Sequence, residues 1–377
     1  MSTQKMRKLL VLLLVFVVAV VTGLVSGCKT ETATAAAAET TTAAAETTVT
    51  AKKFKIGIAM QYLGSPYFVA MADYLKEYAT EKGFEVIGVL DSQRDVTKEA
   101  NNIESLISLD ADFIISNPAD AVGSVAILEE VYKEGIPVIC VDNSPPEGTH
   151  IVTSITSDNV NNGVEVGKWV GENYFKDKTI YSIMLSIVKS CNVCYERRTG
   201  LIDGIIQART GWDAQTSWDS AVKLEQELID KGKAYHKEAD FYILGQGWGE
   251  GQEQKGLTEA EDLLVANNNV NLILGESDAM LLGAMTAVKN QGLTDQVILA
   301  AAADGQKEAY AMIKAGSPYV ATGLNSPTLV AKQAIDLAWE ILTQGKDPYS
   351  YDKIQYTPPA CINPTNVDKY YDPDAIF

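Results

Sequence analysis

Polar and aromatic side chains follow several apolar runs of this chain at the points where strands are expected to end. They are amides, hydroxyls, carboxylates and aromatic rings: Gln61, Ser65, Tyr67 and Phe68 after the first run, then Asp142 and Asn143, Ser277, Asp304 and Asn325. Nearly all of them can donate or accept hydrogen bonds, and none forms a nucleophile–base pair. The pattern therefore favours the binding of a small polar molecule over covalent catalysis.

The elements that must position these side chains alternate between short apolar runs and amphipathic stretches. The first half contains four runs, separated by helical patterns over residues 66–82, 96–109 and 123–133: "FKIGIAM", "FEVIGVLD", "ADFIISN" and "IPVICVD". Runs without polar alternation predict strands buried on both faces, and hence a parallel sheet covered by helices. Ligands of such sheets bind at the carboxyl ends of the strands, which is where the candidate side chains are expected.

A second set of the same kind follows. Its runs are "TIYSIML", "DFYILG", "NLILG", "VILAAAAD" and "YVATGL", with helical patterns over residues 196–208, 254–266, 278–289 and a further one that ends near 312. The folded part starts near Lys53 and extends to the end of a chain of 377 residues. This length is more than one hydrophobic core usually supports, so two α/β lobes are predicted. The mostly polar segment 212–239, which has a helical pattern, is predicted as a surface insertion.

The first 52 residues differ in composition from the remainder and are predicted to be a targeting and tethering segment. Lys5, Arg7 and Lys8 precede an apolar run that ends in "LVSGC", which resembles the lipobox of bacterial lipoproteins. Residues 1–27 are then a signal peptide, Cys28 is lipidated, and the Thr/Ala/Glu-rich residues 28–52 are a tether. An uncleaved membrane anchor and ordinary secretion are the alternatives; the lipoprotein interpretation places the body outside the cytoplasm.

Charge and cysteine content limit the partners. The net charge of −18 argues against nucleic acid. In "CNVC", Cys191 and Cys194 are predicted to form a local disulfide, a redox-active dithiol being the alternative; Cys140 and Cys361 either pair or stay free. No metal site is predicted, because the two histidines, His150 and His236, lie far from the cysteine pair in sequence.

The order and spacing of several motifs resemble a known family. "GSPYFVAM", "SNPADAVG", "SDNVNNGVEVGKWV", "ERRTGLIDGI" and "ESDAMLLGAM", within residues 54–370, resemble the type I periplasmic binding proteins, in the ribose-binding-protein-like branch that serves sugar ABC transporters. The resemblance implies two doubly wound parallel-sheet lobes joined by a three-segment hinge. The N-terminal lobe would comprise residues 53–157 and about 326–357, and the C-terminal lobe residues 158–325 and about 358–377.

The resemblance also implies roles for the candidate residues. Tyr67 and Phe68 would pack on a sugar face, although either ring could instead close its helix onto the sheet. Asp142 and Asp304 would accept hydrogen bonds from sugar hydroxyls. The remaining polar positions are Gln61, Ser65, Ser277 and Asn325, with Ser277 equally credible as a helix N-cap, and Trp248 would supply a second aromatic wall.

Two departures leave the ligand open. Members that bind ribose or galactose usually carry arginines where this chain has Asn143 and Tyr195, and Arg197 matches a more structural arginine. A sugar derivative, a polyol or an unusual monosaccharide is therefore as credible as ribose. Asn143, Tyr195 and Arg197 are still predicted to bind the ligand, which brings the predicted ligand-binding residues to twelve.

The expected function is that of a monomeric, lipid-anchored solute-binding protein without a cofactor. It would capture a small carbohydrate between its lobes and deliver it to an ABC transporter permease. The alternatives are a receptor that presents its closed form to a chemotaxis or kinase sensor, and a binding protein for a non-sugar ligand such as a nucleoside. An enzyme is not expected, because no GxGxxG follows the first strand and neither a GxSxG elbow nor a P-loop occurs.

Overall fold

A computed structural model describes residues 53–189 and 191–377. The predicted signal peptide, the tether and Cys28 lie outside the described residues. None of the helices in the described ranges has the length and apolar character needed to cross a bilayer.

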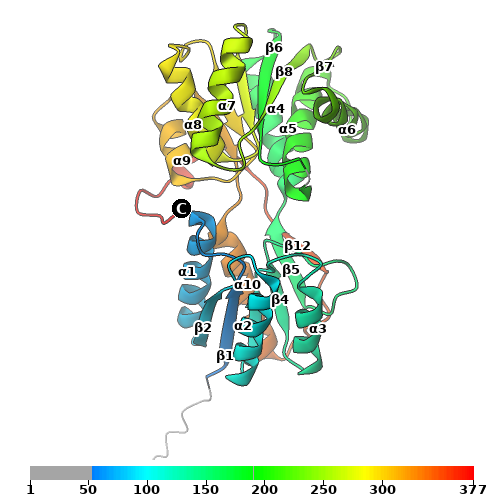
Figure 1. Ribbon diagram of the computed structural model, residues 1–377, viewed down its shortest axis with the longest axis vertical. Helices are drawn as coiled ribbons and strands as arrows, with labels where there is room; N and C mark the ends of the chain where they lie inside the picture. The colour runs from blue at the N-terminus through cyan, green and yellow to red at the C-terminus, as the bar shows by residue number, and fades with distance from the viewer. Residues whose placement is uncertain (1–52, 190) are drawn as a thin grey trace, which may run out of the picture. The chain divides into compact units, whose positions relative to one another are not determined.

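The first lobe is built on a six-stranded sheet whose strands all run parallel, in the order β12-β5-β4-β3-β1-β2. Its strands are β1 (Lys55–Met60), β2 (Glu85–Asp91), β3 (Phe113–Ser116), β4 (Val138–Val141), β5 (Thr153–Ser157) and β12 (Ile354–Thr357). Its helices, α1 (Pro66–Glu81), α2 (Val96–Ser108), α3 (Val125–Lys133) and α10 (Pro327–Gln344), cover both faces (Figure 1). Within β3, Ile115 packs in the core beneath α1 and α10, whereas its neighbour Ile114 packs beneath α2 and α3. Burial on both faces is the reason for the unbroken apolar runs.

The second lobe repeats this plan on a seven-stranded sheet of order β13-β11-β10-β9-β6-β8-β7. The strands are β6 (Ile180–Ser186), β7 (Ala234–His236), β8 (Phe241–Trp248), β9 (Leu272–Gly275), β10 (Ile298–Ala301), β11 (Tyr319–Gly323) and β13 (Cys361–Ile362). The helices are α4 (Asn159–Tyr174), α5 (Asn192–Thr210), α6 (Ala214–Lys231), α7 (Glu253–Ala266), α8 (Asp278–Asn290) and α9 (Lys307–Lys314), followed by a short 3-10 turn, η1 (Val367–Lys369). Only the edge strands β7 and β13 are antiparallel, so the predicted doubly wound α/β fold is confirmed.

Three segments connect the lobes, namely β5 to α4, β11 to α10 and β12 to β13 (Figure 1). Side chains of these segments contact one another. Ser157 Oγ donates a hydrogen bond to Asn325 Oδ1 at 2.5 Å, and Ser157 Oγ lies 3.4 Å from Thr357 Oγ1. The three crossings are thus joined by hydrogen bonds in addition to running side by side.

The segment 212–239 is not the surface insertion that its polar composition predicted. Ala221 and Leu228 of α6 are fully buried in the core of the second lobe, and Glu225 is 4% exposed against Arg198. The polar residues occupy the outer face of an amphipathic helix, while β7 extends the edge of the sheet. Composition averaged over the segment concealed the narrow apolar stripe.

Helices α4 and α5 approach so closely that glycine is required where they meet. A methyl group on Gly204 would lie 2.1 Å from the carbonyl oxygen of Val164, and one on Gly167 would lie 2.4 Å from that of Leu201. Both obstacles are backbone atoms, which cannot rotate away. This seam fixes the helix that carries Arg197 relative to the helix that begins at Asn159.

We expect Gly204→Ala to destabilise the protein. Alanine gains about 1 kcal/mol over glycine in helix propensity, but the clash with Val164 costs about 1–3 kcal/mol or more because the seam must open. Because the 2.1 Å contact is with backbone, we place the cost in the upper part of that range, so thermal and urea unfolding should show a net loss of about 1–2 kcal/mol. The control is Glu165→Ala, an exposed position on the facing helix α4, which is expected to stay within about 0.5 kcal/mol of wild type. Equal stability of the two variants would contradict the close packing.

Candidate ligand-binding site

A cavity of about 450 Å³ lies between loops of the two lobes, at the carboxyl ends of their strands. Nine of the twelve predicted ligand-binding residues line it: Gln61, Ser65, Tyr67, Phe68, Asp142, Arg197, Ser277, Asp304 and Asn325. Residues that the sequence did not single out also line it, among them Arg94, Ser157, Asn159, Gln306 and Phe377. The site therefore combines carboxylates, amides and hydroxyls with a pair of arginines and several aromatic rings.

A hydrogen-bond network centred on Asn325 joins the cavity to the hinge. Asn325 Oδ1 accepts from Tyr67 Oη at 2.8 Å and from Ser157 Oγ at 2.5 Å, and its Nδ2 donates to Asp304 Oδ1 at 3.3 Å. Because both hydroxyls donate to the same oxygen, the orientation of the amide is defined.

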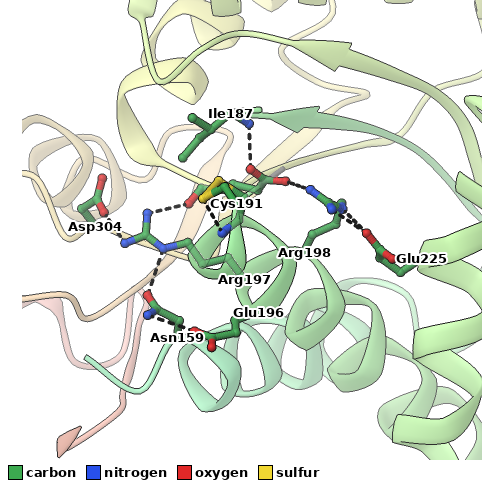
Figure 2. Close-up of a disulfide and its surroundings, with 10 residues drawn as sticks. Asn159, Ile187, Cys191, Glu196, Arg197, Arg198, Glu225 and Asp304 are labelled. Atoms are coloured by element: carbon green, nitrogen blue, oxygen red, sulfur yellow. Dashed lines mark hydrogen bonds and ion pairs between the residues drawn. A yellow bond between two sulfur atoms is a disulfide. The ribbon is translucent and has the colours of Figure 1, made fainter. Parts of the chain in front are cut away.

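Arg197 is held by groups from three elements of the second lobe (Figure 2). Its Nη2 lies 2.9 Å from Asp304 Oδ1, and its Nε donates to Asn159 Oδ1 at 3.0 Å. A third bond runs from Nη1 to the carbonyl oxygen of Glu276 at 3.2 Å. With 6% of its surface exposed, the guanidinium mainly orders its neighbours, while part of it still borders the cavity.

The loop that carries Asp304 is organised by a buried carboxylate behind it. Asp278 Oδ2 accepts from the backbone N–H groups of Gly305 and Gln306, both at 2.7 Å. Its Oδ1 accepts from Tyr319 Oη and from Thr322 Oγ1, both at 2.6 Å. Burial raises the pKa of Asp278, although these hydrogen bonds stabilise its ionised form.

Asp142 follows β4 in a left-handed conformation, with φ 63°, which Asp tolerates better than most residues. Its backbone N–H donates to the carbonyl oxygen of Ile155 at 2.8 Å. Burial raises the pKa of its carboxyl group to about 6, and repulsion from Asp304 adds to the shift while Arg197 opposes it. The two carboxylates of the cavity thus compete for one guanidinium.

The aromatic wall begins with Tyr67 and Phe68, on the first turn of α1. Their rings meet edge to face with centroids 5.4 Å apart, and the ring of Phe377 contacts Tyr67 in the same way at 5.4 Å. Tyr67, 9% exposed, also belongs to the core of the first lobe, so it serves both packing and the site. Phe377 comes from an irregular tail that no periodicity could place.

Three predicted residues lie elsewhere, two of them at a second cavity of about 930 Å³. The left-handed turn at Asp142 directs Asn143 away, so that its Nδ2 donates to the carbonyl oxygen of Pro118 at 3.0 Å. Tyr195 lies two residues from Arg197 on α5, or about 200° around the helix, and therefore faces the second cavity. Trp248 ends β8 and does not line the first cavity, to which the loop after β8 contributes Gly251.

The two serines that could cap helices do not do so. Ser65 precedes α1 and Ser277 precedes α8, both with extended backbone, but neither side chain makes a capping hydrogen bond. Arg94 could have been found by the rule that located the others, because it follows β2 closely; its guanidinium stacks on Tyr62, 4.7 Å from the ring centroid.

The structure contains the Cys191–Cys194 disulfide, with Cα atoms 5.2 Å apart. Both cysteines line the first cavity. Cys140 is buried and Cys361 half-buried, and both are free thiols. No cluster of three or more His, Cys, Asp or Glu side chains suited to a metal ion occurs within residues 53–189 and 191–377.

We expect Asp142→Asn to stabilise the ligand-free protein at neutral pH. A carboxyl group whose pKa is raised to about 6 from 3.8 stabilises the fold below its unfolded pKa, and that contribution is lost as the pH rises through about 6. At about 1.4 kcal/mol per pKa unit, the amide should gain about 3 kcal/mol at pH 7.5 and progressively less towards pH 4. Thermal unfolding at both pH values measures this.

Asp304→Asn is the matched control, because it removes the partner of Arg197 and should lower stability at pH 7.5. If the melting temperature of Asp142→Asn at pH 7.5 is no higher than that of wild type, burial of the ionised Asp142 carboxylate does not destabilise the folded protein.

Comparison with known proteins agrees with this architecture. A family model described as a periplasmic binding protein domain matches residues 56–347. The ribose import binding protein RbsB of Bacillus subtilis is 26% identical over 291 residues, which cover 77% of this chain and 82% of that protein. The D-apiose import binding protein of Actinobacillus succinogenes is 25% identical over 74% of this chain and 79% of its own length.

Solved structures share the fold. An ABC transporter periplasmic solute-binding protein from Actinobacillus succinogenes with bound D-allose has a TM-score of 0.67 at 22% identity, covering 84% of this chain and all of its own. The Caulobacter myo-inositol binding protein has a TM-score of 0.64 at 24% identity, covering 84% of this chain and 95% of its own. The family model covers most strands of both sheets and well over half of the chain, and the chain therefore belongs to the periplasmic binding protein domain family.

Proposed function

We propose that this protein is an extracytoplasmic solute-binding protein, anchored through a lipid on Cys28, that captures a small carbohydrate and delivers it to an ABC transporter permease. Closure of the lobes on the ligand is a population shift driven by contacts that the ligand makes with both of them. The lipid anchor rests on the "LVSGC" motif, and the location outside the cytoplasm is that of the family.

One observation in particular supports the proposal that this cavity binds a ligand. Four buried side-chain atoms in the described part of the chain lack a hydrogen-bond partner, and two of them, Ser277 Oγ and Gln306 Oε1, belong to residues that line the cavity. A buried polar atom without a hydrogen-bond partner costs about 1–3 kcal/mol. The presence of two such atoms at one cavity therefore needs an explanation. A polyhydroxylated ligand supplies the missing partners.

The other groups of the cavity fit a carbohydrate in particular. Asp142 and Asp304 accept hydrogen bonds from neighbouring hydroxyls, and the ring of Phe68 offers a surface to C–H groups. The names of two relatives also support a carbohydrate, because they are a ribose import binding protein and a D-apiose import binding protein. The titles of the structural neighbours name D-allose and myo-inositol.

The same residues, and the relatives named as binding proteins, support binding without reaction. The described residues around the cavity include no histidine, and their two cysteines are joined in the disulfide. We therefore propose a receptor and not an enzyme.

A thermal-shift screen of the purified chain tests this function. Pentoses, hexoses, polyols, amino sugars, nucleosides and amino acids are compared, and at least one sugar or polyol should raise the melting temperature, because a ligand that binds only the folded form stabilises it. A shift with nucleosides or amino acids alone would preserve the receptor but reject the carbohydrate.

We further expect Ser277→Ala to weaken the binding of that ligand about 5- to 10-fold, the equivalent of one hydrogen bond of about 1 kcal/mol. The ligand-free protein should be as stable as wild type or more so, because an unsatisfied hydroxyl has been removed.

The matched control is Thr199→Val, since Thr199 Oγ1 is equally buried and unpartnered but does not line the cavity. Calorimetric titration should show unchanged affinity for Thr199→Val. Equal affinity losses in the two variants would mean that Ser277 has no direct contact with the ligand.

A further inference from the structure

The Cys191–Cys194 disulfide, drawn in Figure 2, lines the ligand cavity. Helix α5 begins at Asn192, one turn before the start that the helical pattern predicted at residue 196. Three residues of this early turn, Cys191, Val193 and Cys194, line the cavity. The wall that the second lobe presents there therefore exists because the helix extends to the disulfide.

This turn has a cavity on each side. Cys191 and Val193 border the first cavity, of about 450 Å³, and also the second, of about 930 Å³. Packed protein gives a side chain 6–12 neighbours that hold it in place, and within this turn Cys194 has such packing, with 1% of its surface exposed. Cys191 and Val193, which stand between the two cavities, are only partly buried. The disulfide joins the exposed start of the turn to its buried part.

The bonds that fix the turn can be followed along the chain. At the start of the preceding loop, the backbone N–H of Ile187 donates to Glu276 Oε2 at 2.7 Å, and Glu276 in turn is paired with Arg198 (Figure 2). Beyond it, Val188 is 41% exposed. At the start of α5, the backbone N–H of Tyr195 donates to the carbonyl oxygen of Cys191 at 3.0 Å, and the backbone N–H of Cys194 donates to Cys191 Sγ at 3.2 Å. Sulfur is a weak acceptor, so the covalent bond is the stronger constraint.

We infer that the disulfide is a specificity-determining part of the ligand site, and that full affinity requires it to be intact. Its sulfur atoms, with Val193, Ile187 and Ala279, form an apolar surface on the second lobe that would contact a C–H face of the carbohydrate. The inference rests on the proposed function, because it concerns the same cavity and the same ligand.

The inference can be tested by reducing the Cys191–Cys194 disulfide with a dithiol, which is a two-electron reaction. The Sγ–Sγ bond breaks, each sulfur takes up a proton, and the dithiol is oxidised to its own disulfide. Without the cross-link the first turn of α5 is free to fray, and Val193 leaves its place in the wall. Linkage requires the reverse effect as well: a ligand that binds the oxidised form more tightly makes the disulfide harder to reduce by the same factor.

The experiment uses the full chain and dithiothreitol. The ligand is whichever of D-ribose, D-allose and myo-inositol gives the largest melting shift with oxidised wild-type protein, and its affinity is measured by calorimetry for the oxidised, reduced and reoxidised chain. We expect the affinity for the ligand to fall at least about tenfold when the disulfide is reduced and to recover when it is reoxidised. Saturating ligand should then lower the reduction potential of the disulfide by about 30 mV per tenfold of affinity.

Two variants complete the test. The Cys191→Ser/Cys194→Ser double variant should bind as weakly as the reduced protein and should not respond to dithiothreitol, whereas Cys361→Ser, which removes a free thiol, should respond like wild type. A merely structural disulfide would change the ligand-free melting temperature but leave affinity and the potential shift unaffected, and that result overturns the inference. If none of the three carbohydrates shifts oxidised wild-type protein, the carbohydrate with the largest shift in the full thermal-shift screen replaces them in the titrations. If no carbohydrate of that screen gives a shift, the proposed function falls, and the inference with it.

Discussion

The side-chain amide of Asn325 is the point on which the rest of the site depends. It lies on one of the three crossings between the lobes, and its oxygen receives hydroxyls from Tyr67 and from Ser157. Its nitrogen reaches Asp304. An aromatic residue of the first lobe, a second crossing and a carboxylate of the second lobe therefore share one amide group. Movement of either lobe about the hinge must alter these bonds, which couples the hinge to the cavity.

Consecutive arginines on α5 divide two tasks between them. Arg197 orients Asp304 and Asn159 at the cavity, whereas Arg198, 1% exposed, donates through Nε to Glu225 Oε1 at 2.9 Å and also pairs with Glu276 (Figure 2). Burial raises the pKa of Glu276 despite the adjacent guanidinium. Because an unpaired charge at such depth is costly, the two carboxylates and Arg198 stabilise each other only as a group. Glu225 belongs to α6, so the additional helix is part of the framework behind the site.

The apolar runs predicted most of the strands, and the rule that ligands bind at carboxyl ends led to nine of the residues that line the cavity. The unbroken apolar runs identify these strands because parallel strands are buried on both faces. Helix α10 was not predicted, although Ser326 and Pro327 are local signals of a helix start. Strand β12 was not predicted because it pairs with β5, which lies about 200 residues earlier. Such long-range pairing leaves no local signal.

The misplaced residues show a second limit. Asn143 is adjacent to a residue that lines the cavity and Tyr195 lies two positions from one, but a left-handed turn and a helical rotation direct them elsewhere. A motif identifies the segment, whereas the backbone conformation decides which of its side chains faces the ligand. Phe377 illustrates the converse, because its role depends only on where an irregular tail returns.

The glycine seam between α4 and α5 has a consequence for how specificity can change. Its backbones touch at Gly167 and Gly204, so substitutions cannot shift one helix along the other without breaking the contact. Asn159 and Arg197, which these helices present at the site, can therefore be exchanged for other side chains while the frame beneath them stays in register. A scaffold of this kind separates the evolution of ligand preference from the evolution of the fold.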